Sequence, residues 1–133
     1  MKTRFPHRPG GFTLIEISLV LALIIGLTAA IGFGVSGVQQ WQKAKNGSLA
    51  LQAVYGAQRS YLADHPTAEI TAVTASQLQG YLPQGWTTMP TAIGLDGETL
   101  TIDYSVMPPR LVLGSTLYDP SATHSDGLWD VGE

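Results

Sequence analysis

The sequence predicts an α+β fold, with one long N-terminal helix packed on a small antiparallel β head. Three observations carry this prediction. The 22 residues from Ile17 to Val38 contain no charge, which is long enough for a membrane-spanning helix. Apolar side chains then continue at helical spacing to about Ala63. After that, two segments in residues 99–115 have strand character.

Length and composition limit the classes of protein that this chain can be. With 133 residues and 14.2 kDa, it has room for one hydrophobic core. Hydrophobic residues make up 44% and charged residues 13%, against about 25% charged in an ordinary soluble domain. This excludes a disordered chain and a highly charged nucleic-acid tail. Cysteine is absent, which excludes disulfides, thiolate metal sites and cysteine nucleophiles.

Residues 1–11 are predicted to be a leader outside the fold. Lys2, Arg4 and Arg8 give them a charge of +3 with no acidic residue. A basic start before an apolar run resembles a secretory signal, but this run exceeds the roughly 7–15 residues of a signal peptide. A plain signal anchor is one alternative. In both cases the positive charges keep the N-terminus in the cytoplasm and export the remainder.

Glu16 distinguishes a plain anchor from a more specialised segment. It stands at the membrane edge of the apolar run, where a carboxylate is costly unless it is paired or stays near water. An anchor has no need of such a residue. Glu16 therefore suggests a partner cation at the start of the helix.

The residues around Glu16 resemble the processing signal of type IV pilins and type II secretion pseudopilins. The matching stretch is Gly11-Phe12-Thr13-Leu14-Ile15-Glu16, after a short basic leader and before an uninterrupted apolar helix. The resemblance covers about residues 1–40. It implies a pilin-like fold, cleavage by a prepilin peptidase between Gly11 and Phe12, and methylation of the new N-terminal Phe12.

The same resemblance implies a role for Glu16 and a set of partners. Glu16 would pair with the amine of Phe12, in its own chain or in the next subunit, and so set the stagger of a helical polymer. The implied partners are other copies or related pilins, the prepilin peptidase and an inner-membrane assembly platform. The implied location is a single-pass inner-membrane protein with a periplasmic head, later part of a periplasmic or surface filament.

The helix is predicted to run from about Thr13 to about Ala63. Residues 12–38 would form the transmembrane and filament-core part, and residues 39–63 its continuation in the head. In the spanning part Gly32-Phe33-Gly34 is the expected place for local unwinding, and Asn46-Gly47-Ser48 is a weak point where a kink is expected. The predicted head-facing stripe is Leu51, Val54, Tyr55 and Leu62, supported by Ala50, Ala57 and Tyr61, with Gln52, Gln58 and Arg59 away from it.

The rest of the head, residues 64–133, is predicted to be a small α+β part with an acidic tail. Asp64-His65-Pro66 ends the long helix. Residues 74–82 read as a short helix capped by Thr74 or Ser76. Residues 94–98 read as a turn, and the segments 99–106 and 110–115 as an antiparallel pair. The tail from Tyr118 onward is predicted to be irregular.

Candidate chemistry is sparse. Neither a nucleophile elbow, a phosphate-binding glycine loop nor an HExxH motif occurs, so no catalytic residue and no enzyme is predicted. The oxygen-rich tail gives a calcium hypothesis with Asp119, Asp126 and Asp130 as candidate ligands. In the family that this chain resembles, major pseudopilins often have a calcium site in their C-terminal loop, but their usual tail pattern is not recognisable here, and the spacing is not that of an EF-hand. A solvated loop without metal is the favoured alternative, so no cofactor is predicted.

Charge and length separate the possible functions. Three of the seven basic side chains lie in 1–11, so residues 12–133 carry four basic and ten acidic side chains. Nucleic-acid binding is therefore not expected. Short length and missing cysteines favour a type II secretion pseudopilin, with major and minor subunits both open. The alternatives are a type IV pilus subunit for adhesion, motility or DNA uptake, and a non-polymerising, single-span anchored binding module.

Overall fold

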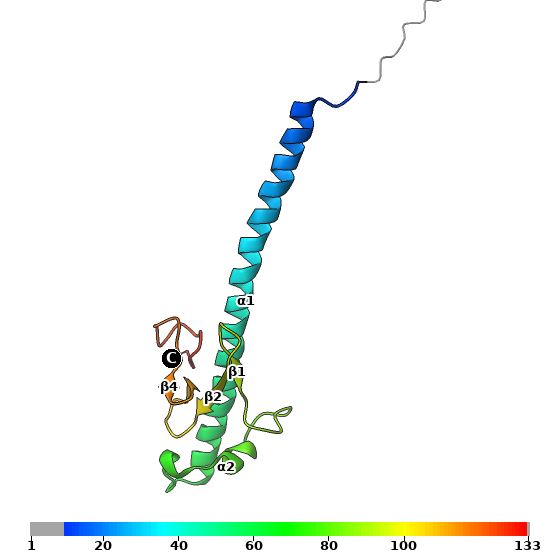
Figure 1. Cartoon of the computed structure of the whole chain (residues 1–133). Helices are drawn as coiled ribbons and strands as arrows, with labels where there is room; N and C mark the ends of the chain where they lie inside the picture. Colours follow the sequence, from blue (N-terminus) through cyan, green and yellow to red (C-terminus); the bar gives the residue numbers. More distant parts are fainter. Residues whose placement is uncertain (1–9, 133) are drawn as a thin grey trace, which may run out of the picture. The chain divides into compact units, whose positions relative to one another are not determined.

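The computed structural model describes residues 10–132, apart from the side chain of Phe33. It shows an α+β arrangement of the pilin-like kind that the sequence predicts: a long N-terminal helix packed on a four-stranded antiparallel sheet (Figure 1). Most of the predicted leader, residues 1–9, lies outside the described residues, as does Glu133. By contacts the chain divides into two compact units, one ending at Gly37 and one beginning at Val38.

The helix α1 spans Leu14–Asp64, within one residue of the prediction at each end. At its start Thr13 Oγ1 accepts the backbone N–H of Glu16 at 3.2 Å, as expected of a helix N-cap. At its end Pro66 prevents continuation. Residues 46–48, the expected weak point, are helical, and the helix is uninterrupted there.

The sheet follows the chain in the order β1-β2-β3-β4, and every neighbouring pair is antiparallel. The predicted pair is confirmed as β2 (Thr99–Asp103) and β3 (Arg110–Leu113), with Ile102 opposite Leu111. Two further strands, β1 (Ala92–Ile93) and β4 (Thr116–Leu117), extend it at the edges. Each has two residues, which is too short for an alternating pattern to reveal.

Two short helices connect α1 to the sheet. The 3₁₀ helix η1 spans Ile70–Ala72 and the helix α2 spans Ala75–Gln79, shorter than the predicted 74–82. Thr74 is the N-cap residue of α2, and its backbone N–H donates to Gln77 Oε1 at 2.8 Å. The tail after β4 is irregular, as predicted.

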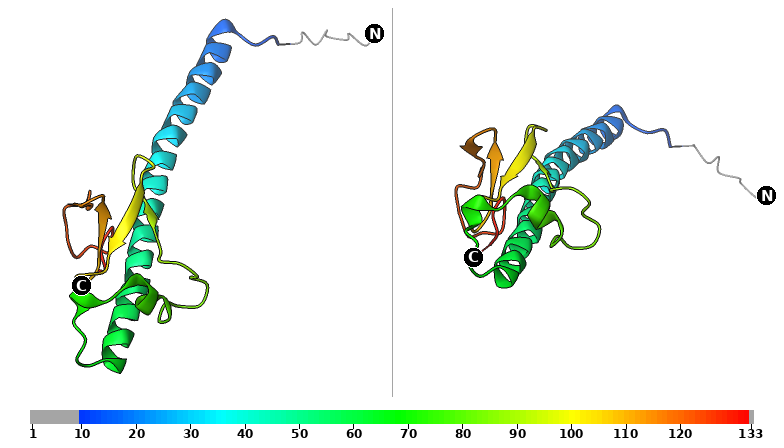
Figure 2. Two further views of the ribbon diagram at one scale, coloured as in Figure 1. Left: turned by 60° about the horizontal axis from the view of Figure 1, so that its bottom comes forward. Right: turned by 90° about the horizontal axis from the view of Figure 1, so that it is seen from below.

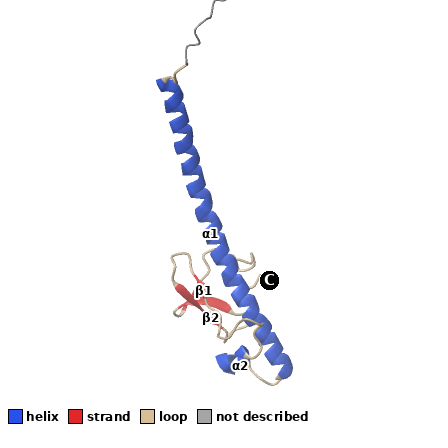
Figure 3. Ribbon diagram, turned by 90° about the vertical axis from the view of Figure 1, so that its right-hand side faces the viewer, coloured by secondary structure: helices blue, strands red, loops and turns tan. Residues whose placement is uncertain are grey.

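The core of the second unit lies between the sheet and residues 44–61 of α1, which run side by side in all views (Figures 2 and 3). The predicted stripe is confirmed at Leu51 and Val54, which are fully buried against Leu100 and Leu111. Tyr55 and Leu62 are only partly buried. Trp129 brings the tail into the same core and is 5% exposed.

Gly47 explains why the helix passes so close to this core. A Cβ atom at this position would lie 3.0 Å from Leu111 Cδ1 and 3.3 Å from Trp129 Cε3. The glycine therefore serves packing against the head. The glycine that the sequence analysis counted as part of a weak point is thus a packing position.

The prediction that Gln58 lies away from the core was wrong. Gln58 is fully buried, and its Nε2 donates to the backbone carbonyls of Tyr104 and Val106 at 2.8 and 2.9 Å. These carbonyls lie beyond the end of β2 and have no strand partner. A buried carbonyl needs a hydrogen-bond donor. The amide of Gln58 is that donor, and an apolar side chain at this position could not be.

Three other polar side chains of α1 bind loop carbonyls of the head in the same way. Ser48 Oγ donates to the carbonyl of Gly127 at 2.8 Å. Lys43 Nζ donates to that of Leu95 at 2.9 Å, and Gln52 Nε2 to that of Val131 at 3.3 Å. With Gln58, these side chains hold the irregular parts of the head against the helix.

Candidate functional site

The predicted processing site lies directly before α1. Gly11, Phe12 and Thr13 are not helical, and the helix begins at Leu14. Gly11 is exposed, and a Cβ atom there would meet nothing within 4 Å. The peptide bond between Gly11 and Phe12 is therefore in an accessible, non-helical segment of the kind that a peptidase needs.

Phe12 and Glu16 lie on one side of the helix start. They line the same hollow of about 240 Å³, together with Ile17, Val20 and Leu21. Phe12 lies two residues before the helix, and Glu16 is in its first turn. An amine created at Phe12 would thus stand at the same end of the helix as the Glu16 carboxylate.

Thr13 and Glu16 also form a local pattern that the sequence analysis missed. Threonine followed three residues later by glutamate is the signature of a capping box, and the hydrogen bond from Glu16 N–H to Thr13 Oγ1 matches its first half. A carboxylate in the first turn also interacts favourably with the helix dipole, which stabilises the helix by about 0.3–1 kcal/mol. Glu16 therefore has a role in starting the helix besides any role toward an amine.

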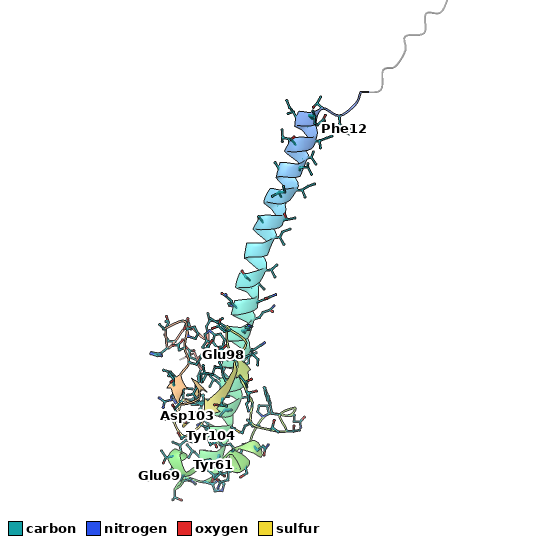
Figure 4. All side chains as sticks on the ribbon, viewed as in Figure 1. Phe12, Tyr61, Glu69, Glu98, Asp103 and Tyr104 are labelled. Atoms are coloured by element: carbon teal, nitrogen blue, oxygen red, sulfur yellow. The ribbon has the colours of Figure 1, made fainter. Side chains whose placement is uncertain are left out.

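The first half of α1 exposes apolar side chains on all sides (Figure 4). Leu14 is 86% exposed, and the exposed set is Phe12, Leu14, Ile15, Ile17, Leu19, Val20, Leu21, Leu23, Ile24, Ile25, Leu27, Ile31, Val35 and Val38. The helix is long and apolar enough to cross a membrane. Such a surface needs lipid or other apolar helices around it.

Two hydroxyl groups of this half form hydrogen bonds within the helix. Ser18 Oγ donates to the carbonyl of Leu14 at 2.8 Å, and Thr28 Oγ1 to that of Ile24 at 3.0 Å. This bonding suits hydrocarbon, where water is not available as a partner. Gly32 and Gly34 are helical, so the unwinding expected at residues 32–34 stays a prediction for the assembled state.

The three calcium candidates do not gather at one point. Asp119 and Asp130 line one cavity of about 310 Å³, whereas Asp126 does not line it. Asp126 Oδ1 instead accepts the N–H of Leu128 at 2.9 Å. Among residues 10–132, no group of three His, Cys, Asp or Glu side chains is placed to hold a metal ion.

The two cavity carboxylates each use one oxygen locally and leave the other without a donor. Asp119 Oδ1 accepts from Ser121, and Asp130 Oδ1 accepts the N–H groups of Gly127 and Gly132. Their Oδ2 atoms are buried and accept no hydrogen bond from the described residues. His124 Nδ1 lies 3.4 Å from Asp119 Oδ2 and forms an ion pair only when protonated. Asp119, His124 and Asp130 thus line one cavity, which Arg110 also lines, without forming a group of three placed to hold a metal ion.

A third polar cluster connects the helix with both edges of the sheet. Tyr118 OH accepts the N–H of Leu95 at 2.7 Å, and burial raises the pKa of this phenol. Hydrogen bonds from its own backbone N–H and from Tyr118 lower the pKa of Glu98, with the charge of Lys43 adding a smaller effect. The Glu98 carboxylate lies over Gly94, where a Cβ atom would collide with it.

The remaining histidine has a structural position. His65 lies just beyond α1, with Nδ1 3.1 Å from the carbonyl of Tyr61 and its ring stacked on that of Tyr61. Tyr61 also packs edge-on against Tyr81, whose hydroxyl donates to Asp64 Oδ2 at 2.9 Å and so has a raised pKa. This agrees with the helix-end role expected for His65.

Comparisons with protein-family models, with curated proteins and with solved structures found no match for this chain.

Proposed function

We propose that this chain is a structural subunit of a type II secretion pseudopilus or a related type IV pilus-like filament. In this proposal a prepilin peptidase cuts between Gly11 and Phe12 and methylates Phe12. The subunit is held in the inner membrane by the first half of α1, with its head in the periplasm. It then enters a filament in which those apolar helices form the core.

The observation that supports the proposal best is the position of Glu16. A carboxylate shares a hollow with Phe12 at the start of α1, where the described large apolar side chains from Leu14 to Val38 are exposed. A membrane anchor gains little from such a carboxylate. A helix bundle with an amine at Phe12 needs it, because a buried cation without a partner anion is strongly destabilising.

Processing is tested by mass spectrometry of the full chain extracted from membranes. The expected mature chain begins at Phe12 and carries one extra methyl group on its amine. Gly11→Val should leave the precursor uncut, while Gly10→Val serves as a neighbouring control that should still be cut. An intact Met1 in the unmodified protein, or a cut near Ala30, contradicts the proposal.

Assembly is tested separately with Glu16→Ala. Removing one member of a buried charge pair costs about 3–5 kcal/mol, so filaments should be lost while cleavage and head folding persist. Glu16→Asp should be partly tolerated because it keeps the charge. Ser18→Ala is the control, because it also removes a polar side chain from this segment but leaves Glu16 in place. Equal filament yield from Glu16→Ala and the parent favours the anchored binding module.

A further inference from the structure

The second half of α1 leaves one face uncovered by its own head. The exposed residues recur at helical spacing and define what we name the open helix face: Leu49, Gly56, Arg59, Ser60 and Ala63. The opposite face carries Leu51, Val54 and Tyr61 into the core. A shallow depression of about 380 Å³ lies on the open helix face beside Arg59.

Charges of opposite sign are segregated within this unit. From Val38 onward α1 holds three basic side chains and one acidic one, Asp64. The described segments after α1 hold a single basic residue, Arg110, which pairs with Asp103 at 3.1 Å. Their acidic residues are Glu69, Asp96, Glu98, Asp103, Asp119, Asp126 and Asp130. The helix is therefore basic and the segments around it are acidic.

Arg59 is the exposed cation of this helix that has no anion. Its guanidinium lies over the ring of Tyr55, 5.9 Å from the ring centre, and no carboxylate among the described residues is within ion-pair distance. In the tail, Asp119 and Asp130 are engaged with neighbouring groups. Asp126 is exposed and forms no ion pair with a described residue.

We propose that the open helix face of one copy receives the acidic loop Tyr118–Gly132 of the next copy, with Arg59 paired to Asp126. This deepens the proposed function and rests on it. A contact between two different surfaces of identical chains is heterologous, and repetition of it produces an open helical filament. An isologous contact through the open helix face would place Arg59 near its own equivalent, and this like-charge contact is unfavourable.

The first experiment reverses charges in the full-length chain and measures filament yield. Arg59→Glu should lower the yield roughly tenfold, because like charges face each other at the contact. Asp126→Arg should do the same, and the double variant should recover most of the yield. Arg59→Lys keeps the charge and is the matched control. The thermal midpoint of each variant is measured to confirm that the head is folded.

Two results overturn the pairing. Unchanged yield with Arg59→Glu, in a parent chain that does polymerise, removes this contact and leaves the proposed function intact. If Glu69→Arg or Asp96→Arg restores the filament yield of Arg59→Glu and Asp126→Arg does not, the acidic loop is not the partner. A parent chain that is uncut and forms no filament instead removes the proposed function, and this contact with it.

A second experiment keeps both charges and detects the contact directly. The chain has no cysteine. The double variant with Ser60→Cys and Ser125→Cys therefore places one thiol beside Arg59 and one beside Asp126. A short bis-maleimide should join assembled copies into a ladder longer than dimers, since each chain offers both surfaces. Ser60→Cys alone is the control and should give no ladder. Absence of a ladder from the double variant in intact filaments overturns the proposal.

Discussion

The two halves of α1 have the same backbone structure and opposite surfaces. Before Val38 every described large apolar side chain of α1 is exposed, whereas beyond it most apolar side chains form one stripe that the head covers, and Trp41 and Leu49 are exposed. The first half therefore depends on surroundings outside the chain, and the second carries its own cover. Helix content alone does not distinguish them. The distribution of apolar side chains around the helix does.

The sharpest test of this comparison is a matched pair of truncations. Leu51→Ala should lower the free energy of unfolding of the head by about 2–5 kcal/mol, because it leaves a cavity beside Leu100 and Leu111. Leu23→Ala, at a position that is 61% exposed, should leave that free energy unchanged. Denaturant titration of the full chain in mild detergent, followed by near-UV circular dichroism, measures both. Equal losses would contradict a self-contained head.

The calcium hypothesis is now a prediction about Asp119 and Asp130. If the cavity holds calcium, calcium at 100 times its dissociation constant should stabilise the head by about 2.7 kcal/mol. Asp119→Asn and Asp130→Asn should remove this gain, and Asp126→Asn should keep it, because Asp126 does not line the cavity. Thermal midpoints with calcium and with a chelator measure the effect. Identical midpoints in the parent chain would end the hypothesis.

Gln58 tests whether polar side chains on the covered side of α1 stabilise the head. Gln58→Leu should cost about 1–3 kcal/mol, since the carbonyls of Tyr104 and Val106 lose their donor. Gln52→Leu is the control, because its one bond to Val131 is exposed, and it should cost less. The same denaturant titration distinguishes them. A smaller loss for Gln58→Leu than for Gln52→Leu would show that burial of the amide is not what matters.

The smallest expected effect is the response of the head to acid. Hydrogen bonds from Ser105, with the Arg110 ion pair, lower the pKa of Asp103, and Glu98 has a lowered pKa for the reasons given above. Both carboxyls thus bind protons more readily in the unfolded chain than in the folded one. Their contribution is complete above their ordinary values of about 4 and declines as pH falls through the lower folded values.

Thermal midpoints between pH 7 and pH 3 measure this decline. Asp103→Asn should flatten the curve below about pH 4, because that position then no longer titrates. Ser105→Ala should flatten it less, since the bond to Arg110 remains. A midpoint that rises on acidification would contradict the lowered values.

The sequence determined the features that depend on neighbours along the chain. The bounds of α1 follow from an unbroken helical pattern and from Pro66, and the pairing of β2 with β3 follows from two alternating segments around a turn. The segment Gly11–Glu16 and the exposed apolar helix after it need no tertiary contact to be recognised. These features depend on period and on local stereochemistry, which the order of residues fixes.

Only the tertiary structure decided which polar and small residues meet the head. Gln58 is buried because carbonyls at the end of β2 need a donor, and Gly47 is required because Leu111 and Trp129 lie against the helix there. Asp119 and Asp130 share a cavity although eleven positions separate them in the sequence. The strands β1 and β4 exist only as additions to their neighbours. The strands pair with near neighbours in the sequence, whereas Gln58 and Gly47 meet groups distant in sequence, whose approach is set by packing of the whole head on α1 and not by any local pattern.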